Sequence, residues 1–144
     1  MNNKGFLLIQ NLLGLFLLGL VVLVCLSTLN SAIYNLGLTK TKMEMIYTAE
    51  SIIEQIKSFD YNNTEDTEFI FDMQLIELIE TLKNQEEASI FLPLDMENLE
   101  YKYICHIYKI EKDNLWEVMI SITSKNEVKN INNVEIMALL PIPK

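Results

Sequence analysis

Cys105 and His106 are adjacent in this sequence, and their side chains are of types that could act together in catalysis. A thiol and an imidazole within reach of each other can form a nucleophile and its base. They lie in LEYKYICHIYKI (99–110), a stretch typical of a β-strand, where neighbouring side chains point to opposite faces. We therefore expect no catalytic pair here. His106 is the only histidine and has no second metal-binding side chain at ligand spacing, so we expect no zinc site. The only other cysteine, Cys25, lies in an apolar run, and we expect two free and mostly buried thiols.

An acidic, amide-rich segment at residues 60–66 carries oxygen-bearing side chains of the kind that ligate calcium. They are Asp60, Asn62, Asn63, Glu65 and Asp66. Their spacing lacks the glycine of an EF-hand loop, so a solvated acidic loop is the simpler interpretation. Calcium binding in this loop stays open, and we expect no other metal site.

Several catalytic and cofactor-binding motifs depend on glycine, which occurs four times in the sequence. The glycines are Gly5, Gly14, Gly19 and Gly37, all in the first third of the chain. The sequence holds no Gly-rich phosphate loop, no nucleophile elbow and no dinucleotide-binding fingerprint. We therefore expect no enzymatic activity and no cofactor.

Charge is distributed very unevenly along the 144 residues, a length that allows one domain and an appendage. The formal net charge is −9, and Lys4 is the only charged residue before Lys40, so residues 40–144 together carry −10. Binding to nucleic acid phosphates requires a cationic surface. We therefore expect no direct nucleic acid partner.

The apolar stretch FLLIQNLLGLFLLGLVVLVCL (6–26) predicts a helix that spans a membrane. About 20 apolar residues, each rising about 1.5 Å, cross a hydrocarbon core of roughly 30 Å. Only Gln10 and Asn11 interrupt the stretch, and both lie near its start. We expect the transmembrane helix at residues 6–28.

A removed secretory signal is the main alternative for this stretch, but its apolar part exceeds the usual length of such signals. Cleavage after Ala32 would put Asn30 where a small residue is required, and Val24 precedes Cys25 where a lipoprotein signal needs a small residue. The N-terminal amine and Lys4 favour a cytoplasmic N-terminus, which puts the acidic C-terminal domain outside.

The first thirty or so residues carry a more specific pattern. A short leader, MNNKG, ends in Lys4-Gly5, Phe6 follows, and the apolar helix begins at once. This resembles the type IV prepilin and pseudopilin family, and the resemblance covers roughly residues 4–35. It implies that residues 1–5 are a leader peptide, that a prepilin peptidase cuts between Gly5 and Phe6, and that Phe6 is then N-methylated.

The same resemblance implies a structural function. The chain would be a subunit of a type IV pilus, a type II secretion system or a competence pseudopilus. Its partners would be the membrane, the prepilin peptidase, other pilins or pseudopilins and an inner-membrane assembly platform. The alternative is an unrelated single-pass membrane protein with a small extracytoplasmic domain, which would keep its Gly5–Phe6 bond intact.

Gln10 departs from the family pattern. It would be the fifth residue of the processed chain, where most pilins carry a glutamate that is thought to pair with the N-terminal ammonium of a neighbouring subunit. A buried charge is costly unless an opposite charge offsets it, and a neutral amide cannot do so. Gln10 therefore indicates a minor subunit, with simple tolerance of glutamine at this position as the alternative.

After the apolar stretch, residues 29–59 predict an amphipathic extension of the same helix. The expected apolar stripe is Ile33, Leu36, Met43, Ile46, Ala49, Ile53 and Ile56. The expected polar face is Lys42, Glu44, Glu50, Glu54 and Lys57. The helix should end near Phe59, where DYNNTEDTE begins a turn-rich segment.

Residues 60–144 predict a soluble α+β domain with a small antiparallel sheet. We expect a short strand at EFIF (68–71), a helix over residues 72–85 with Asp72 as its N-cap, and a loop over SIFLPLDMEN (89–98). Period-two alternation predicts strands at residues 99–110, 115–124 and 133–142, with EKDN as the hairpin between the first two. We therefore expect an α+β fold with a long N-terminal helix packed on a small antiparallel sheet. The resemblance to pilins implies the same layout, so the expected fold class is α+β and pilin-like.

Overall fold

The computed structural model describes residues 3–62, 68–97, 100–125 and 133–143, with side chains from Gly5 onward. The chain divides into two compact units, residues 1–39 and residues 40–144. Its class is α+β, with one long N-terminal helix and a four-stranded antiparallel sheet. The expected fold class is confirmed at this level.

Helix α1 runs from Asn3 to Ser58, so it ends within one residue of the predicted end. Its first part, within the unit of residues 1–39, is uncharged after Lys4 and its large apolar side chains are exposed. Among the described residues, α1 alone is long and apolar enough to cross a membrane, judged by length and composition. The helix continues through Gly37, where a glycine is tolerated at a cost of about 1 kcal/mol relative to alanine.

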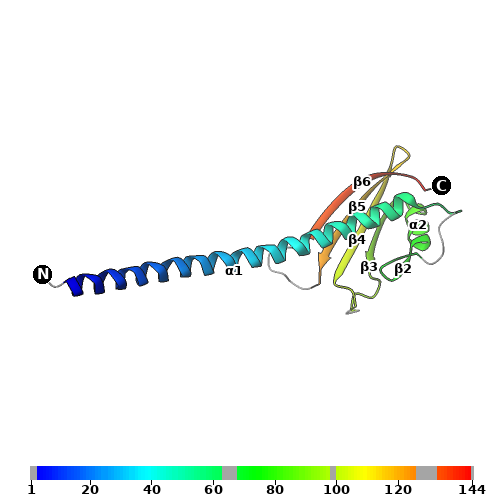
Figure 1. The fold of residues 1–144 in the computed structure, drawn as a ribbon. Coiled ribbons are helices and arrows are strands. Elements are labelled where there is room, and N and C mark those ends of the chain that lie inside the picture. Colours follow the sequence, from blue (N-terminus) through cyan, green and yellow to red (C-terminus); the bar gives the residue numbers. More distant parts are fainter. Residues whose placement is uncertain (1–2, 63–67, 98–99, 126–132, 144) are drawn as a thin grey trace. The chain divides into compact units, whose positions relative to one another are not determined.

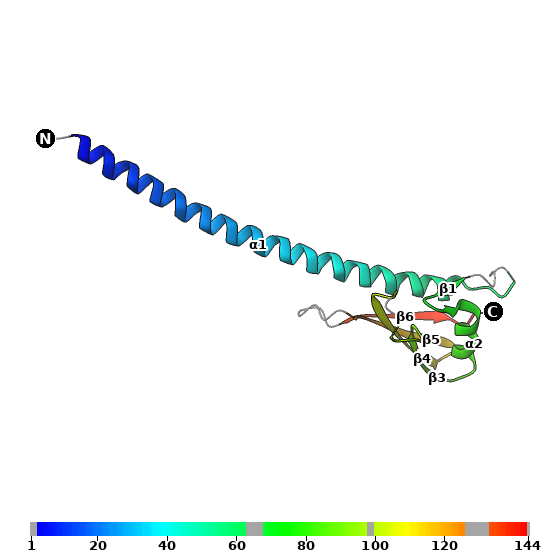
Figure 2. The same cartoon turned by 90° about the horizontal axis from the view of Figure 1, so that it is seen from below.

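Within the unit of residues 40–144, the rest of α1 is amphipathic and lies against one face of the sheet (Figures 1 and 2). Its buried residues are Met45, Ala49, Ile52, Ile53 and Ile56, which recur at the spacing of one helix face. The predicted stripe was therefore right for Ala49, Ile53 and Ile56, and Ile46 is partly buried against the core, but the prediction missed Met45 and Ile52. It was wrong for Ile33, Leu36 and Met43, which are exposed because the buried face begins only at Met45.

The main sheet has the order β3-β4-β5-β6, and every neighbouring pair is antiparallel. Its strands are β3 (Glu87–Leu92), β4 (Tyr103–Lys112), β5 (Leu115–Ser124) and β6 (Asn133–Pro141). The predicted strand at 115–124 is confirmed, β6 ends one residue earlier than expected, and β4 is shifted toward the C-terminus. Asp113 and Asn114 form the β4–β5 turn with φ of 53° and 61°, the left-handed conformation that a two-residue hairpin turn of type I′ needs.

Two predictions about residues 72–98 were wrong. Residues 87–92 form β3, whereas the sequence predicted a loop from residue 89; the strand is held by pairing with β4, which the local sequence does not reveal. Asp72 is not a helix N-cap, because helix α2 (Leu75–Lys83) has Gln74 as its N-cap residue, without a hydrogen bond from that side chain. Asp72 lies instead in the turn between β1 (Phe69–Ile70) and β2 (Met73–Gln74), and its carboxylate accepts hydrogen bonds from the Leu94 and Asp95 amides at 2.9 and 3.3 Å.

The core of residues 40–144 lies between α1, α2 and the inner face of the sheet. β5 contributes Trp116, Val118, Ile120 and Ile122, all fully buried, as the alternation predicted. From β6 the inner face receives Val134 and Leu140, with Ile136 and Ala138 partly buried between them. From α2 the core receives Leu75, Leu78, Ile79 and Leu82.

Candidate functional site

The three residues that the sequence marks for processing and assembly lie in the first turns of α1. Gly5 and Phe6 are adjacent, and Gln10 follows Phe6 by four residues, which places Phe6 and Gln10 on one face of the helix. Both side chains are exposed within the chain. Helical side chains lean toward the N-terminus, so the Gln10 amide leans toward the turn that holds Phe6. The side chains of Phe6 and Gln10 are both neutral.

Gly5 lies in a helical conformation with open space around it, because a Cβ atom built on it would meet nothing within 4 Å. The chain's own packing therefore does not require glycine at this position. If glycine is required here, the requirement comes from a molecule that acts on the chain.

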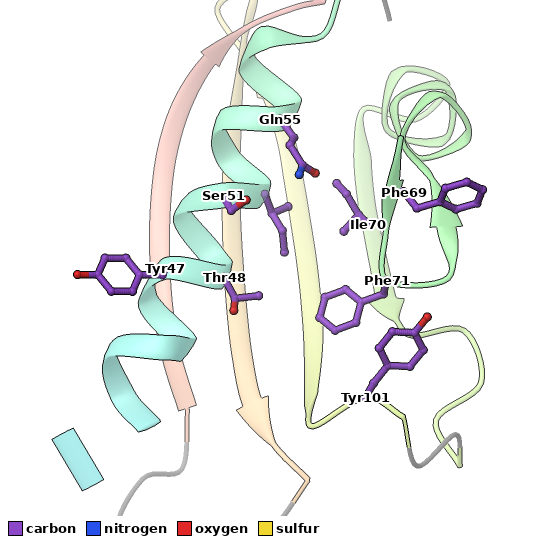
Figure 3. Close-up of a pocket in the computed structure, with 9 residues that line it drawn as sticks. Tyr47, Thr48, Ser51, Gln55, Phe69, Ile70, Phe71 and Tyr101 are labelled. Atoms are coloured by element: carbon purple, nitrogen blue, oxygen red, sulfur yellow. The ribbon is translucent and has the colours of Figure 1, made fainter. Parts of the chain in front are cut away.

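An open groove of about 550 Å³ lies in the domain, between α1 and the β1–β2 turn (Figure 3). Figure 3 shows the Phe71 ring extending from the β1–β2 turn toward α1, with Tyr101 close to it, and the two ring centroids are 5.5 Å apart. Phe71 has a φ of 57°, which non-glycine residues adopt rarely and at some cost. The lining residues are Tyr47, Thr48, Ser51, Ile52, Gln55, Phe69, Ile70, Phe71 and Tyr101.

These lining residues include no carboxylate, ammonium or imidazole, although the domain as a whole is strongly acidic. Thr48 turns its hydroxyl back to donate to the Glu44 carbonyl at 2.8 Å. The groove therefore offers aromatic and aliphatic surface with a few neutral polar groups. Such a surface can accommodate an uncharged, apolar segment, but it supplies no acid or base for chemistry.

A polar cluster joins α1 to the start of β4. The Glu44 carboxylate accepts a hydrogen bond from the Lys102 ammonium at 2.6 Å and another from the Tyr103 hydroxyl at 2.7 Å. These two bonds lower the pKa of Glu44, and the bond to Glu44 raises the pKa of Lys102. Burial is the main cause of the raised pKa of Tyr103. The cluster fixes the second half of α1 against the sheet, whereas the sequence predicted Glu44 on a purely solvent-facing side.

We expect Glu44→Gln to destabilise the domain at neutral pH and to have less effect in acid. Because the folded state lowers the pKa of Glu44, its contribution is present above the unfolded value of 4.5 and is lost as the pH falls through the folded pKa. Urea unfolding of both proteins at pH 7 and near pH 3 measures this. An equal difference at the two pH values would contradict a role for the ionised carboxylate.

Lys109 is a buried charged side chain that the sequence analysis did not single out. It is fully buried, and its Nζ donates to the Gln85 carbonyl at 2.7 Å and contacts the Glu111 carboxylate at 3.3 Å. The ammonium also lies 4.9 Å from the centre of the Trp116 ring. Period two from Tyr103 places residue 109 on the inner face, and that signal could have found it. The lysine holds the α2–β3 connection to the sheet.

Cys105 and His106 point to opposite faces of β4, as expected, and form no pair. Cys105 is fully buried, and burial raises the pKa of its thiol to about 12. The His106 Nε2 atom lies 2.8 Å from the Ser89 hydroxyl, and the ring stacks on Phe91 with centroids 4.1 Å apart. Cys105 is therefore not poised as a nucleophile, and His106 is satisfied within the sheet.

The two cysteines and the acidic loop at residues 60–66 are the other sites that the sequence singled out. Cys25 and Cys105 are both free thiols, as expected, but only Cys105 is buried, because Cys25 lies in the part of α1 whose side chains are exposed within the chain. Of the acidic loop, Asn63, Glu65 and Asp66 lie outside the described residues, whereas Asp60 accepts hydrogen bonds from the backbone and side-chain nitrogens of Asn62 at 2.9 and 3.2 Å. In the described parts of the chain, no three histidine, cysteine or acidic side chains gather where they could hold a metal ion.

No protein-family model, curated protein or solved structure matches this chain. Its functional interpretation therefore depends on the sequence pattern at Gly5, Phe6 and Gln10 and on the physical features described above.

Proposed function

We propose that this chain is a minor pilin or pseudopilin subunit of a type IV pilus, a type II secretion system or a competence pseudopilus. The observation that carries the proposal is Lys4-Gly5-Phe6 placed directly before an apolar helix without a charged residue until Lys40. A short basic leader, a glycine and a phenylalanine in that order fit the substrate of a prepilin peptidase. The role is structural, and the proposal assigns no catalysis to the chain.

In this proposal, residues 1–5 are removed on the cytoplasmic face and the new N-terminal Phe6 is methylated. Residues 6–28 then hold the chain in the cytoplasmic membrane, with residues 29–59 continuing the helix and residues 60–144 forming a domain outside. A filament-assembly platform in the membrane would gather the chain with its sibling subunits. The apolar helices would then pack on one another rather than on lipid.

The arrangement of the domain supports this proposal. The second half of α1 is amphipathic and covers one face of a four-stranded antiparallel sheet. The first part of the same helix is apolar on all sides and would lie in the lipid of the membrane. This layout is compatible with a pilin-like subunit. The direct test is whether membranes that contain an active prepilin peptidase hold a chain that begins at Phe6, since an unrelated single-pass protein would keep its leader.

Gln10 is the residue that supports a minor position in the filament. A shaft subunit would meet its neighbour's ammonium at every step, and an amide leaves that charge without an opposite partner in an apolar surrounding. The free-energy cost of this unpaired ammonium would recur at every subunit of a shaft, whereas it would occur at most once for a subunit at the tip. We therefore expect this chain to be present at one or a few copies per filament.

Quantitative mass spectrometry of sheared filaments measures the ratio of this chain to its sibling subunits. We expect a small minority share for the wild-type chain. For a subunit at the tip, Gln10→Glu should reduce assembly, because the new carboxylate would be buried without a partner. If the chain proves to be the dominant component, its assignment as a minor subunit is wrong and glutamine is simply tolerated.

A further inference from the structure

The outer face of the sheet carries large apolar side chains that remain exposed. Alternation along each strand places these residues on the face opposite the core. Leu139 and Met137 on β6 are 67% and 62% exposed, which is unusual for large apolar side chains in the middle of a strand. The others on this face with large exposed areas are Phe91, Ile110 and Leu115. Exposed apolar surface that gathers on one face commonly marks an interaction site.

The strand register brings most of these side chains together beside β6. Leu139 pairs with Glu117, which in turn pairs with Ile110 across β5 and β4. Met137 pairs with Met119, and Pro141 pairs with Leu115. We refer to Ile110, Leu115, Met119, Met137 and Leu139 as the outer patch. It reaches the margin of the sheet at β6.

β6 is an edge strand that is paired on one side only. In the described part of the chain, β6 pairs with β5, whereas β3 at the other margin contacts α2 (Figure 1). The β5–β6 register is continuous from Asn133 to near Pro141, without a bulge. Soluble proteins usually protect such edges with charged side chains, prolines, bulges or very short strands. β6 has no lysine and no bulge, and its only such features are Glu135 near its start and Pro141 at its end, so the apolar stretch from Ile136 to Leu140 is unprotected.

The charges around the outer patch define what can bind to it. Glu87, Glu117 and Glu135 lie on this face, and Lys112 is the one lysine there among the described strands. Glu135 lies on β6 itself, two residues before Met137, and accepts a hydrogen bond from the neutral Asn133 amide at 2.7 Å. A bound strand would therefore meet apolar side chains at one end and a carboxylate at the other.

We propose that the free edge of β6 accepts a β-strand from a second, different protein. That strand carries apolar side chains opposite Leu139 and Met137 and a lysine or arginine opposite Glu135, all on the side of the outer patch. Main-chain hydrogen bonds to β6 provide the pairing, and the cross-strand side chains provide the selectivity. This proposal does not depend on the pilin assignment. The pilin assignment is argued from Gly5, Phe6 and Gln10, whereas strand addition is argued only from residues of the sheet.

A second copy of the chain fits this edge poorly. Antiparallel pairing of two β6 strands about Met137 would place each Glu135 opposite a Leu139, so neither carboxylate would gain a basic partner. Two chains of net charge −9 would also approach each other. Complementary charge thus favours a basic strand over a second copy.

The test uses the full-length protein in lipid nanodiscs and a fluorescent peptide, Thr-Leu-Thr-Leu-Thr-Lys-Thr, whose leucines and lysine match this pattern for antiparallel addition. We expect saturable binding by fluorescence anisotropy, weakened about ten-fold when the peptide's lysine is replaced with glutamate. Methylating the peptide amides that face β6 should abolish binding, whereas methylating the opposite amides should leave it unchanged. Equal effects of the two methylation patterns would overturn strand pairing.

Substitutions in the protein, in place of changes to the peptide, test the same pairing. Glu135→Lys should reverse the preference between the lysine and glutamate peptides, whereas Glu80→Lys, with the same charge change on α2, should not. Leu139→Ser should weaken binding, whereas Leu94→Ser, at a similarly exposed leucine outside the sheet, should not. No binding at about 1 mM peptide, or dimers of the chain that depend on Leu139, would overturn the proposal.

Discussion

Trp116→Ala is expected to lower the free energy of unfolding of the sheet domain by about 3–5 kcal/mol, which is a large share of the stability of a small domain. Trp116 is fully buried on β5, between Glu111 of β4 and Leu140 of β6 in the register. Its removal leaves a cavity and also takes the ring away from the buried Lys109 ammonium. The fully buried lysine would then face an apolar cavity, which places the expected loss toward the upper end.

Urea unfolding of a fragment beginning near Ser31 measures this loss, with circular dichroism as the probe because the only tryptophan is removed. Trp116→Phe should cost much less, since most of the volume stays and Nε1 has no hydrogen-bond partner among the described residues. Leu139→Ala, at an exposed residue of the same sheet, should change the stability by no more than about 0.5 kcal/mol. Similar losses for Trp116→Ala and Leu139→Ala would show that Trp116 is not at the centre of the core.

Gly5→Val is expected to abolish removal of the leader. In the proposed family, the peptidase accepts little more than glycine before the cut, and valine adds a branched side chain there. The chain itself offers open space at this position, so the substitution should leave its own packing unchanged. The loss of processing can then be attributed to recognition by the peptidase.

The measurement compares the electrophoretic mobility and intact mass of the chain in cells that express an active prepilin peptidase. Gly14→Val is the matched control, because this glycine also lies in α1 with open space around it but away from the proposed cut. We expect Gly14→Val to be processed like the wild type. Normal processing of Gly5→Val would contradict the assignment of Gly5 as the residue before the cut.

Local patterns were sufficient for most of the secondary structure. The end of α1 near Phe59 and the strand Leu115–Ser124 each follow from residues close together in the sequence, and so does the hairpin turn predicted at EKDN, of which the structure uses only Asp113 and Asn114 because Glu111 and Lys112 belong to β4. Alternation along β5 also identified its four core residues, including Trp116. These predictions were right because propensity, turn chemistry and burial agree within each segment.

Tertiary pairing decided the features that were missed. β3 looks like a loop in the sequence because Pro93 follows a short apolar run, and only the register with β4 makes it a strand. Asp72 lost its expected capping role because the β1–β2 hairpin places its carboxylate at the Leu94 amide. The sequence places Glu44 on the polar face of the helix, but it does not show that the fold brings Lys102, which is distant in the sequence, within hydrogen-bond distance of it. The roles of Gly5, Phe6 and Gln10 stay predictions, since they depend on other proteins.

The measurement that tests the central proposal most directly is mass spectrometry of the N-terminal peptide, taken from membranes of cells with an active prepilin peptidase. We expect a peptide that begins at Phe6 and carries one added methyl group on its amine. We also expect the same chain to keep residues 1–5 when the peptidase is inactivated. A chain that keeps Met1 and the Gly5–Phe6 bond in the presence of the active peptidase would contradict the pilin assignment.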